Sequence, residues 1–210
     1  MTLPKITDSI IQQVQSTYTV ASKFNTAYLY DICNNVKNVV QSNLFKKYGK
    51  INSAWTQQYV AEYNKDEQED GAKFIRFTLP TPAVTVGDDN SGIMYAGDAD
   101  GCQNYGLVQS RGELNNFLRH RVTKKLPIIL YSDYYLEVYN MPLLKTLLVD
   151  FIPTNPLLLP TYNVDYDEYP LCAEGVAMMK ALVAQSITND QAAKPTDDKQ
   201  DMIDSPTTIK

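Results

Sequence analysis

The sequence predicts an α+β fold with N-terminal helices, a central antiparallel β region with long loops, and a C-terminal helix followed by a flexible tail. Apolar residues recur at helical spacing in the first fifty residues, short aromatic and β-branched runs fill the middle, and a second helical run starts near residue 165. Helical and strand patterns thus occupy separate blocks, which favours α+β over alternating β-α-β units. We expect one domain over residues 1–188 (a helical block over 1–50, a β-rich block over 51–160 and a C-terminal helix over 165–188), then a tail over 189–210.

The N-terminal block predicts two helices. Ile6, Ile10 and Val14 recur at four-residue spacing in the first. The second begins at Asn25, a residue type that caps helix N-termini, and ends at Gly49, which suits a helix exit. Its predicted apolar face is made by Leu29, Ile32, Val36, Val39, Val40 and Leu44.

The middle block predicts short strands joined by turns. "PIILY", then Ser132-Asp133, then "YYLEVYN" is the clearest hairpin signal. The run "GELNNFLRHRVTKKLP" is ambiguous and could be a helical turn that ends before Pro127. Prolines 153, 156 and 160 then predict an extended crossing outside any central strand. Further strands are predicted in "WTQQYVAEY", "KFIRFTLP", "GIMYAG", "YGLVQS" and "KTLLVDFI".

The last helix is predicted from its N-terminal signals. Pro170 suits the first helical position, where a missing N–H costs nothing. Asp165, Asp167 and Glu168 precede it, and carboxylates are stabilised at the positive end of a helix. The polar segment from Asn189 carries two prolines and lacks periodicity, so we expect a tail that orders on a partner.

Composition excludes several classes of protein. The 44% apolar and 20% charged residues are typical of a folded chain, and the net charge of −5 argues against a dedicated nucleic-acid binder. We expect no membrane span and no cleaved secretion leader. The three cysteines (Cys33, Cys102 and Cys172) are scattered, as in reduced proteins made in a cytoplasm. The fifteen tyrosines suit either subunit interfaces or strands.

The residue types needed for catalysis are scarce. His120 is the one histidine, and no G-x-S-x-G, P-loop or G-x-G-x-x-G motif is present. One histidine and three unpaired cysteines lack the spacing of a zinc site. We therefore predict no catalytic residue, no metal and no cofactor, and a protein that is not an enzyme.

Three charged groups have two interpretations each. Asp98-x-Asp100-Gly101 resembles the start of a calcium loop but lacks its later ligands, so we interpret it as a turn. The carboxylates of Asp165, Asp167 and Glu168 could hold a metal, but helix capping accounts for them. The basic run is either a solvated loop or a contact with an acidic surface or a DNA backbone; it contains Arg119, His120, Arg121, Lys124 and Lys125.

The order of these segments resembles the ring, or head-to-tail connector, proteins of short-tailed bacteriophages, especially the crAss-like phages of gut Bacteroidales. The segments are "NTAYLYDICNNVKNVV", the hairpin "PIILYSDYYLEVYN" leading into "KTLLVDFIPTNP", then "YDEYPLCAEGVAMMKALV" and a polar tail. The resemblance covers residues 5 to 188 as an order of elements.

This resemblance implies a virion structural protein of the phage neck or tail, made in the host cytoplasm. Copies would form a closed ring, expected to be twelve-fold, that connects the portal protein to adjoining tail ring proteins. Genomic DNA would pass through the channel without sequence-specific binding and be ejected through it. The alternatives are a head-completion or tail-terminator protein, a small metal-dependent enzyme, and a nucleic-acid-binding regulator that uses the basic run.

Overall fold

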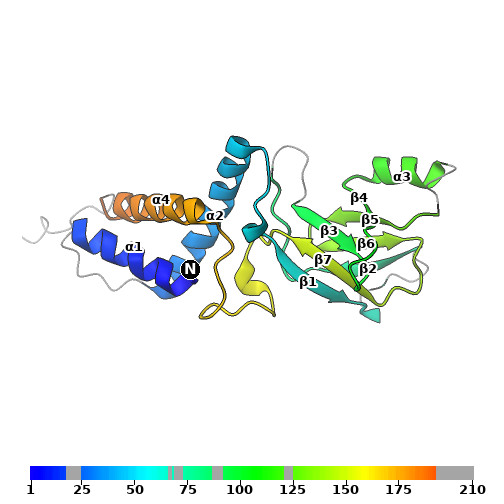
Figure 1. The fold of residues 1–210 in the computed structure, drawn as a ribbon, viewed down its shortest axis with the longest axis horizontal. Coiled ribbons are helices and arrows are strands. Elements are labelled where there is room, and N and C mark those ends of the chain that lie inside the picture. Colours follow the sequence, from blue (N-terminus) through cyan, green and yellow to red (C-terminus); the bar gives the residue numbers. More distant parts are fainter. Residues whose placement is uncertain (18–24, 66–67, 69–72, 87–91, 121–124, 193–210) are drawn as a thin grey trace, which may run out of the picture.

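The computed structural model describes residues 1–17, 25–65, 68, 73–86, 92–120 and 125–192. The chain forms an elongated molecule with three helices at one end and two β-sheets at the other (Figure 1). The predicted α+β class, with N-terminal helices and a C-terminal helix, is confirmed. Within the described residues, no helix is both long enough and apolar enough to cross a membrane.

The helical end contains α1 (Leu3–Thr17), α2 (Thr26–Tyr48) and α4 (Ala173–Ala192), which bury one apolar core. The predicted caps of α2 are confirmed, because the Asn25 side chain accepts a hydrogen bond from Ala27 N and Gly49 ends the helix at φ 66°. The predicted face is partly wrong, since Val39 is 54% exposed. Residues that share the buried face of α2 include Leu29, Cys33, Lys37, Val40, Gln41 and Leu44.

The β end consists of two sheets that enclose a second core. The first sheet has the strand order β1-β7-β3, with β1 (Gln57–Glu62) and β3 (Ile93–Gly97) both antiparallel to β7 (Thr146–Phe151). The second has the order β2-β6-β5-β4. Its strands are β2 (Phe74–Thr78), β4 (Gly106–Val108), β5 (Ile128–Ser132) and β6 (Tyr135–Tyr139).

The predicted hairpin is confirmed, with β5 antiparallel to β6. Its turn lies one residue later than predicted, because Asp133 takes a positive φ of 55° and Ser132 still belongs to β5. The β region is not wholly antiparallel, since β4 runs parallel to β5. A crossover is needed to join parallel neighbours, and the segment that contains α3 (Arg111–Arg119) supplies it. The ambiguous run is thus helical in its first half.

The start of the last helix is corrected. α4 begins at Ala173, so Pro170 lies three residues before the helix and not at its first position. The carboxyl group in the first turn of α4 belongs to Glu174, and not to Asp165, Asp167 or Glu168. The helix also extends to Ala192, into the predicted tail; residues 193–210 lie outside the described stretch of the chain.

The linker from β7 to α4 joins the two ends of the molecule. It contains a short 3-10 helix, η3 (Pro156–Leu158), and the three predicted prolines. α2 packs against this linker through polar side chains: Asn34 donates to Asn155 Oδ1 at 3.1 Å, and Gln41 donates to Pro170 O at 3.1 Å. The Lys37 amine donates to Pro153 O. These hydrogen bonds fix the helical end to the β end.

Candidate interaction surfaces

The acidic residues before α4 make contacts within their own chain. Asp167 Oδ2 accepts from Asn163 N at 2.7 Å, so this carboxylate closes a turn, and the backbone N–H of Asp165 donates to Asn163 Oδ1 at 3.0 Å in the same turn. Glu168 instead pairs with the N-terminal amine of Met1 at 3.1 Å. Within the described residues, no three His, Cys, Asp or Glu side chains converge as metal ligands would.

The Asp98 turn is likewise occupied by its own chain. Gly101 N donates to Asp98 O at 3.0 Å, and Gln103 N donates to Asp98 Oδ1 at 2.9 Å. The hydroxyl of Tyr95 donates to Gln103 O at 2.9 Å and covers the turn. The carboxylate of Asp98 therefore organises a turn, as the sequence indicates.

The basic run is divided by a gap in the described residues. Arg119 is exposed in the last turn of α3, and His120 is the exposed residue that ends this helix. Lys125 is exposed at the start of the segment that leads into β5. Arg121 and Lys124 lie outside the described residues, so the structure does not test whether the four predicted basic residues lie together.

A buried carboxylate lies on the outer face of the second sheet, beneath α3. Glu137 is 5% exposed and contacts the guanidinium of Arg76 at 3.2 Å and that of Arg111 at 3.0 Å. Tyr139 donates to Glu137 Oε2 at 3.0 Å. Burial and this hydrogen bond raise the pKa of Tyr139 to about 12. Sequence patterns did not indicate this cluster, because Glu137 occurs in an ordinary strand pattern and its partners come from β2 and α3.

The geometry of the Glu137 cluster indicates that it holds α3 against the second sheet. Arg76 stands opposite Glu137 in the β2–β6 register, and Arg111 is the first residue of α3. The ion pairs thus attach α3 to the sheet, next to the small apolar core that includes Val108 and Leu114. Both guanidinium groups and the Tyr139 hydroxyl contact the Glu137 carboxylate, and a charge that is buried and paired is expected to hold elements together.

Lys37 is the most unusual titratable group that the structure describes. Its side chain is fully buried in α2 (0% exposed) and faces the carbonyl of Pro153. Burial lowers the pKa of the Lys37 amine to about 7. Burial also raises the pKa of the Cys33 thiol, one helical turn away, to about 12. A lowered amine pKa is typical of some catalytic lysines, but here the amine contacts a carbonyl inside the core.

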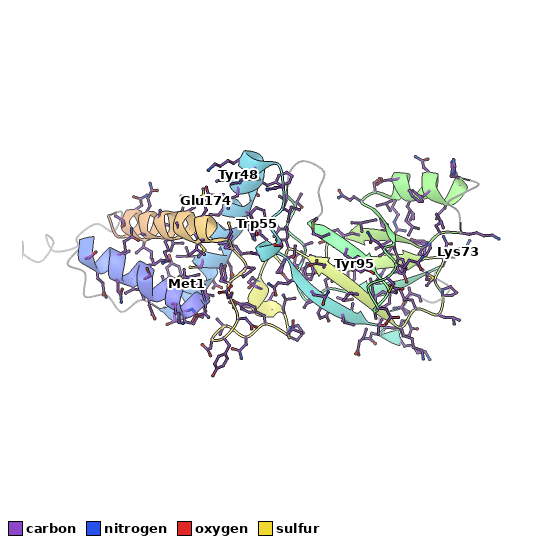
Figure 2. All side chains as sticks on the ribbon, in the orientation of Figure 1. Met1, Tyr48, Trp55, Lys73, Tyr95 and Glu174 are labelled. Atoms are coloured by element: carbon purple, nitrogen blue, oxygen red, sulfur yellow. The ribbon has the colours of Figure 1, made fainter. Side chains whose placement is uncertain are left out.

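A third cluster joins α2 to the first turn of α4 at the surface. Lys47 Nζ lies 2.8 Å from Glu174 Oε1, and the Tyr48 hydroxyl donates to Glu174 Oε2 at 2.8 Å. Figure 2 shows Tyr48 and Glu174 next to each other, with Trp55 below them between the two ends. An apolar cavity of about 410 Å³ lies here, lined by Leu44, Tyr48, Trp55 and Cys172 among others. Its lining also includes Lys50, Asn52 and Glu174, and the Glu174 carboxylate is already engaged by Lys47 and Tyr48.

Large apolar side chains are exposed at both ends of the molecule. The two most exposed are Leu143, at 90%, in the turn between β6 and β7, and Tyr166, at 82%, in the linker before α4. Such side chains are the usual anchors of protein interfaces when they cluster or lie beside a groove. The others include Tyr28, Val39 and Tyr48 at the helical end, and Val60, Tyr63, Met94, Tyr134 and Tyr135 at the β end.

No protein-family model matches the chain, and a search of curated proteins gives no match.

Proposed function

We propose that this chain is a structural protein of a bacteriophage virion that forms an oligomeric ring in the neck or tail. In this role it connects the portal to the tail and lines the passage for DNA. The proposal rests first on the resemblance in segment order described above. The fold is compatible with it, because helices flank a β region in the order that the resemblance implies.

The observation that carries the proposal is the distribution of exposed apolar side chains over two different ends of an elongated molecule. A closed ring uses head-to-tail contacts, in which one patch of a subunit meets a different patch of the next. Leu143 lies in the turn between β6 and β7 and Tyr166 in the linker before α4, so the chain exposes large apolar side chains at two separate places, either of which could meet a different patch of a neighbour.

The net charge of the chain supports a channel through which DNA passes without binding tightly. The formal net charge of −5 repels a phosphate backbone, which would let DNA slide past a ring instead of adhering to it. Of the described members of the basic run, Arg119 ends α3 and Lys125 begins the segment that leads into β5, both at the β end of the molecule (Figure 1). We propose them as contacts with an acidic neighbouring surface or with the DNA backbone, without sequence readout.

The first test asks whether the chain is in the virion and whether it closes into rings. Mass spectrometry of purified particles is expected to detect the chain, and electron microscopy of the chain with portal is expected to show rings. Absence from purified particles would refute the proposal.

Two surface variants test the interface itself. Leu143→Asp and Tyr166→Asp place a charge at nearly fully exposed positions, so the fold is expected to keep its melting temperature while ring formation falls. Gln12→Asp, which adds the same charge at an exposed position of α1, is the matched control and is expected to assemble normally. If rings form equally well with all three variants, Leu143 and Tyr166 are not part of the interface.

A further inference from the structure

The edge strands of the two sheets differ in whether other residues cover their outward backbone groups. Gln68 caps the outer edge of β2, because its side-chain amide accepts from Arg76 N at 3.0 Å and donates to Arg76 O at 2.9 Å. The loop after β3 covers the edge of β3, where Tyr105 N donates to Ala96 O at 2.8 Å and the Asn104 side chain accepts from Ala96 N at 3.3 Å. β4 is three residues long and leads directly toward α3.

β1 is the exception. It is six residues long and pairs with β7 on one side only. Tyr63 N donates to Lys145 O at 2.8 Å in the same register, so the odd-numbered residues turn their backbone groups toward β7. Gln58, Val60 and Glu62 therefore turn their N–H and C=O groups outward. Within the described residues, none of these groups has a hydrogen-bond partner.

A groove runs beside this open edge. It has a volume of about 590 Å³, and its walls include Tyr59 and Val60 of β1, Thr78 at the end of β2, and Pro160 of the linker. An added strand would lie in this groove, with side chains alternating between the groove and solvent. Long, uncapped edges are ready templates for pairing, and proteins that do not use them usually block them.

We propose that the open edge of β1 accepts residues 207–210 of a neighbouring copy as an added antiparallel or parallel strand. The inference deepens the proposed ring, on which it rests. The segment reads "TTIK", and its β-branched Thr207, Thr208 and Ile209 favour a strand. Lys210 supplies a positive charge for the exposed carboxylate of Glu62. Main-chain hydrogen bonds give such a contact its affinity, and alternate side chains give it specificity.

The separation of α4 from β1 is one reason for assigning the strand to a neighbouring copy. The described end of α4 lies at the far tip of the helical end, whereas β1 belongs to the β end (Figure 1). The eighteen residues that follow Ala192 could span at most about 60 Å when extended, which is ample for a contact between adjacent copies. A tail-to-edge contact joins two different patches, as a closed ring requires.

The test uses a fluorescent peptide of residues 193–210 and the full chain at low concentration, followed by anisotropy. Wild-type chain is expected to bind the peptide saturably, and Val60→Pro is expected to bind it at least about tenfold more weakly. The Val60 N–H faces away from β7, so proline there removes no existing ladder bond. Val60→Thr keeps the N–H and is the matched control, with affinity close to that of wild type.

Two further measurements keep the result interpretable. A peptide with Ile209→Asp is expected to lose binding, and equal binding by that peptide would overturn the assignment of the segment. Amide exchange in the wild-type chain is expected to slow at Val60 and Glu62 when the peptide is added, which does not depend on any variant folding. Unchanged exchange at both amides would overturn the assignment of the edge.

The peptide assay and the virion assay can give opposite results, and each tests a different proposal. If the chain is found in virions but its β1 edge does not bind the peptide, the proposed function stands and this interface is refuted. If the chain is absent from virions but binds the peptide, the proposed function is refuted and the β1 edge stands as a self-association site.

Discussion

Lys37→Met tests the account of the buried amine at the junction between the two ends. Lys37 is fully buried, and its amine donates to the carbonyl of Pro153. Methionine has nearly the same length and fills irregular core space without a charge. The substitution therefore removes the titration of the amine while leaving most of the packing in place.

The magnitude follows from the two pKa values of the amine. The pKa is about 7 in the folded chain because of burial, and 10.5 is its ordinary value in the unfolded chain. Between these values the unfolded chain binds more protons, so the free energy of unfolding rises with pH by up to about 1.4 kcal/mol per unit. Below pH 7 the full cost of burying the charge, on the order of 5 kcal/mol, is present. Above pH 10.5 it is absent.

Lys37→Met is consequently expected to be more stable than wild type at pH 6. The gain is the cost of the buried charge, on the order of 5 kcal/mol, less about 1–3 kcal/mol because the Pro153 carbonyl loses its donor. The decisive quantity is the slope. The stability advantage of the variant should shrink by about 2 kcal/mol between pH 7 and pH 8.5.

Urea unfolding of both chains, followed by circular dichroism at pH 6, 7, 8 and 8.5, measures this difference. The range stays below pH 9 because above it the Cys33 thiol, whose pKa burial raises from 9.0 to about 12, lowers the free energy of unfolding of both chains as the pH rises. A stability difference that stays constant from pH 6 to pH 8.5 would refute the reasoning, because it would mean that the folded chain holds the amine at an ordinary pKa.

Two more stability measurements test the β end by urea unfolding. Glu137→Gln is expected to cost about 2–4 kcal/mol, since it leaves two guanidinium groups without their buried counter-charge, whereas Arg111→Ala should cost about 1 kcal/mol or less because that side chain is 65% exposed. Similar losses in the two variants would argue against the buried carboxylate as the centre of the cluster. Gly92→Ala is expected to lower the free energy of unfolding by more than about 3 kcal/mol, because φ is +67° and the new Cβ would lie 2.1 Å from Val84 O. Gly49→Ala, where φ is +66° and no atom lies within 4 Å of the new Cβ, should lower it by only about 1–2 kcal/mol. Equal costs at the two glycines would show that the backbone near Gly92 moves to accommodate the methyl group.

The second helix shows what local sequence can predict. Asn25 and Gly49 determine its ends through contacts within a few residues: the Asn25 side chain accepts from Ala27 N, and Gly49 N donates to Phe45 O. Such contacts can be read directly from residue types and spacing. The apolar face was less predictable, because Val39 fits the helical period but points away from both neighbouring helices.

The start of the last helix shows why other features escape sequence reasoning. Pro170 and the carboxylates before it have the residue types of a helix start. In the fold, Tyr169 N donates to Met1 O, and Pro170 O accepts from Gln41, more than a hundred residues away. These long-range contacts hold residues 168–171 in a non-helical conformation and delay the helix to Ala173. Local signals cannot include partners that only the tertiary fold brings near.

The same reasoning applies to the buried charges. Glu137 fits a strand pattern, and Lys37 fits a helix of mixed polarity, so neither residue type indicates burial. Glu137 is buried because Arg76 lies directly opposite in the β2–β6 register and Arg111 begins α3 above it. Lys37 is buried because the linker carries a proline-rich stretch whose carbonyl needs a donor. Both depend on the register and order of elements distant in the sequence.

The polar junction has a further physical consequence. Asn34, Lys37 and Gln41 lie one turn apart on α2, and all three donate to the linker between β7 and α4. Apolar contacts alone tolerate small rotations, whereas hydrogen bonds lose strength steeply when their geometry changes. The junction therefore gives up stability, through the buried amine, for a defined orientation of the two ends, as some buried polar groups do in other proteins.

This hypothesis predicts that Lys37→Met broadens the relative orientation of the two ends even where it raises stability. Spin labels on the exposed native Cys102 and on Gln185→Cys, at an exposed position of α4, report the distance between the ends; Cys172→Ser avoids a third label. Pulsed electron resonance is expected to give a narrow distance distribution for the parent chain and a wider one for Lys37→Met. Equal widths would show that apolar packing alone sets the orientation, and the buried amine would then destabilise the fold without fixing its geometry.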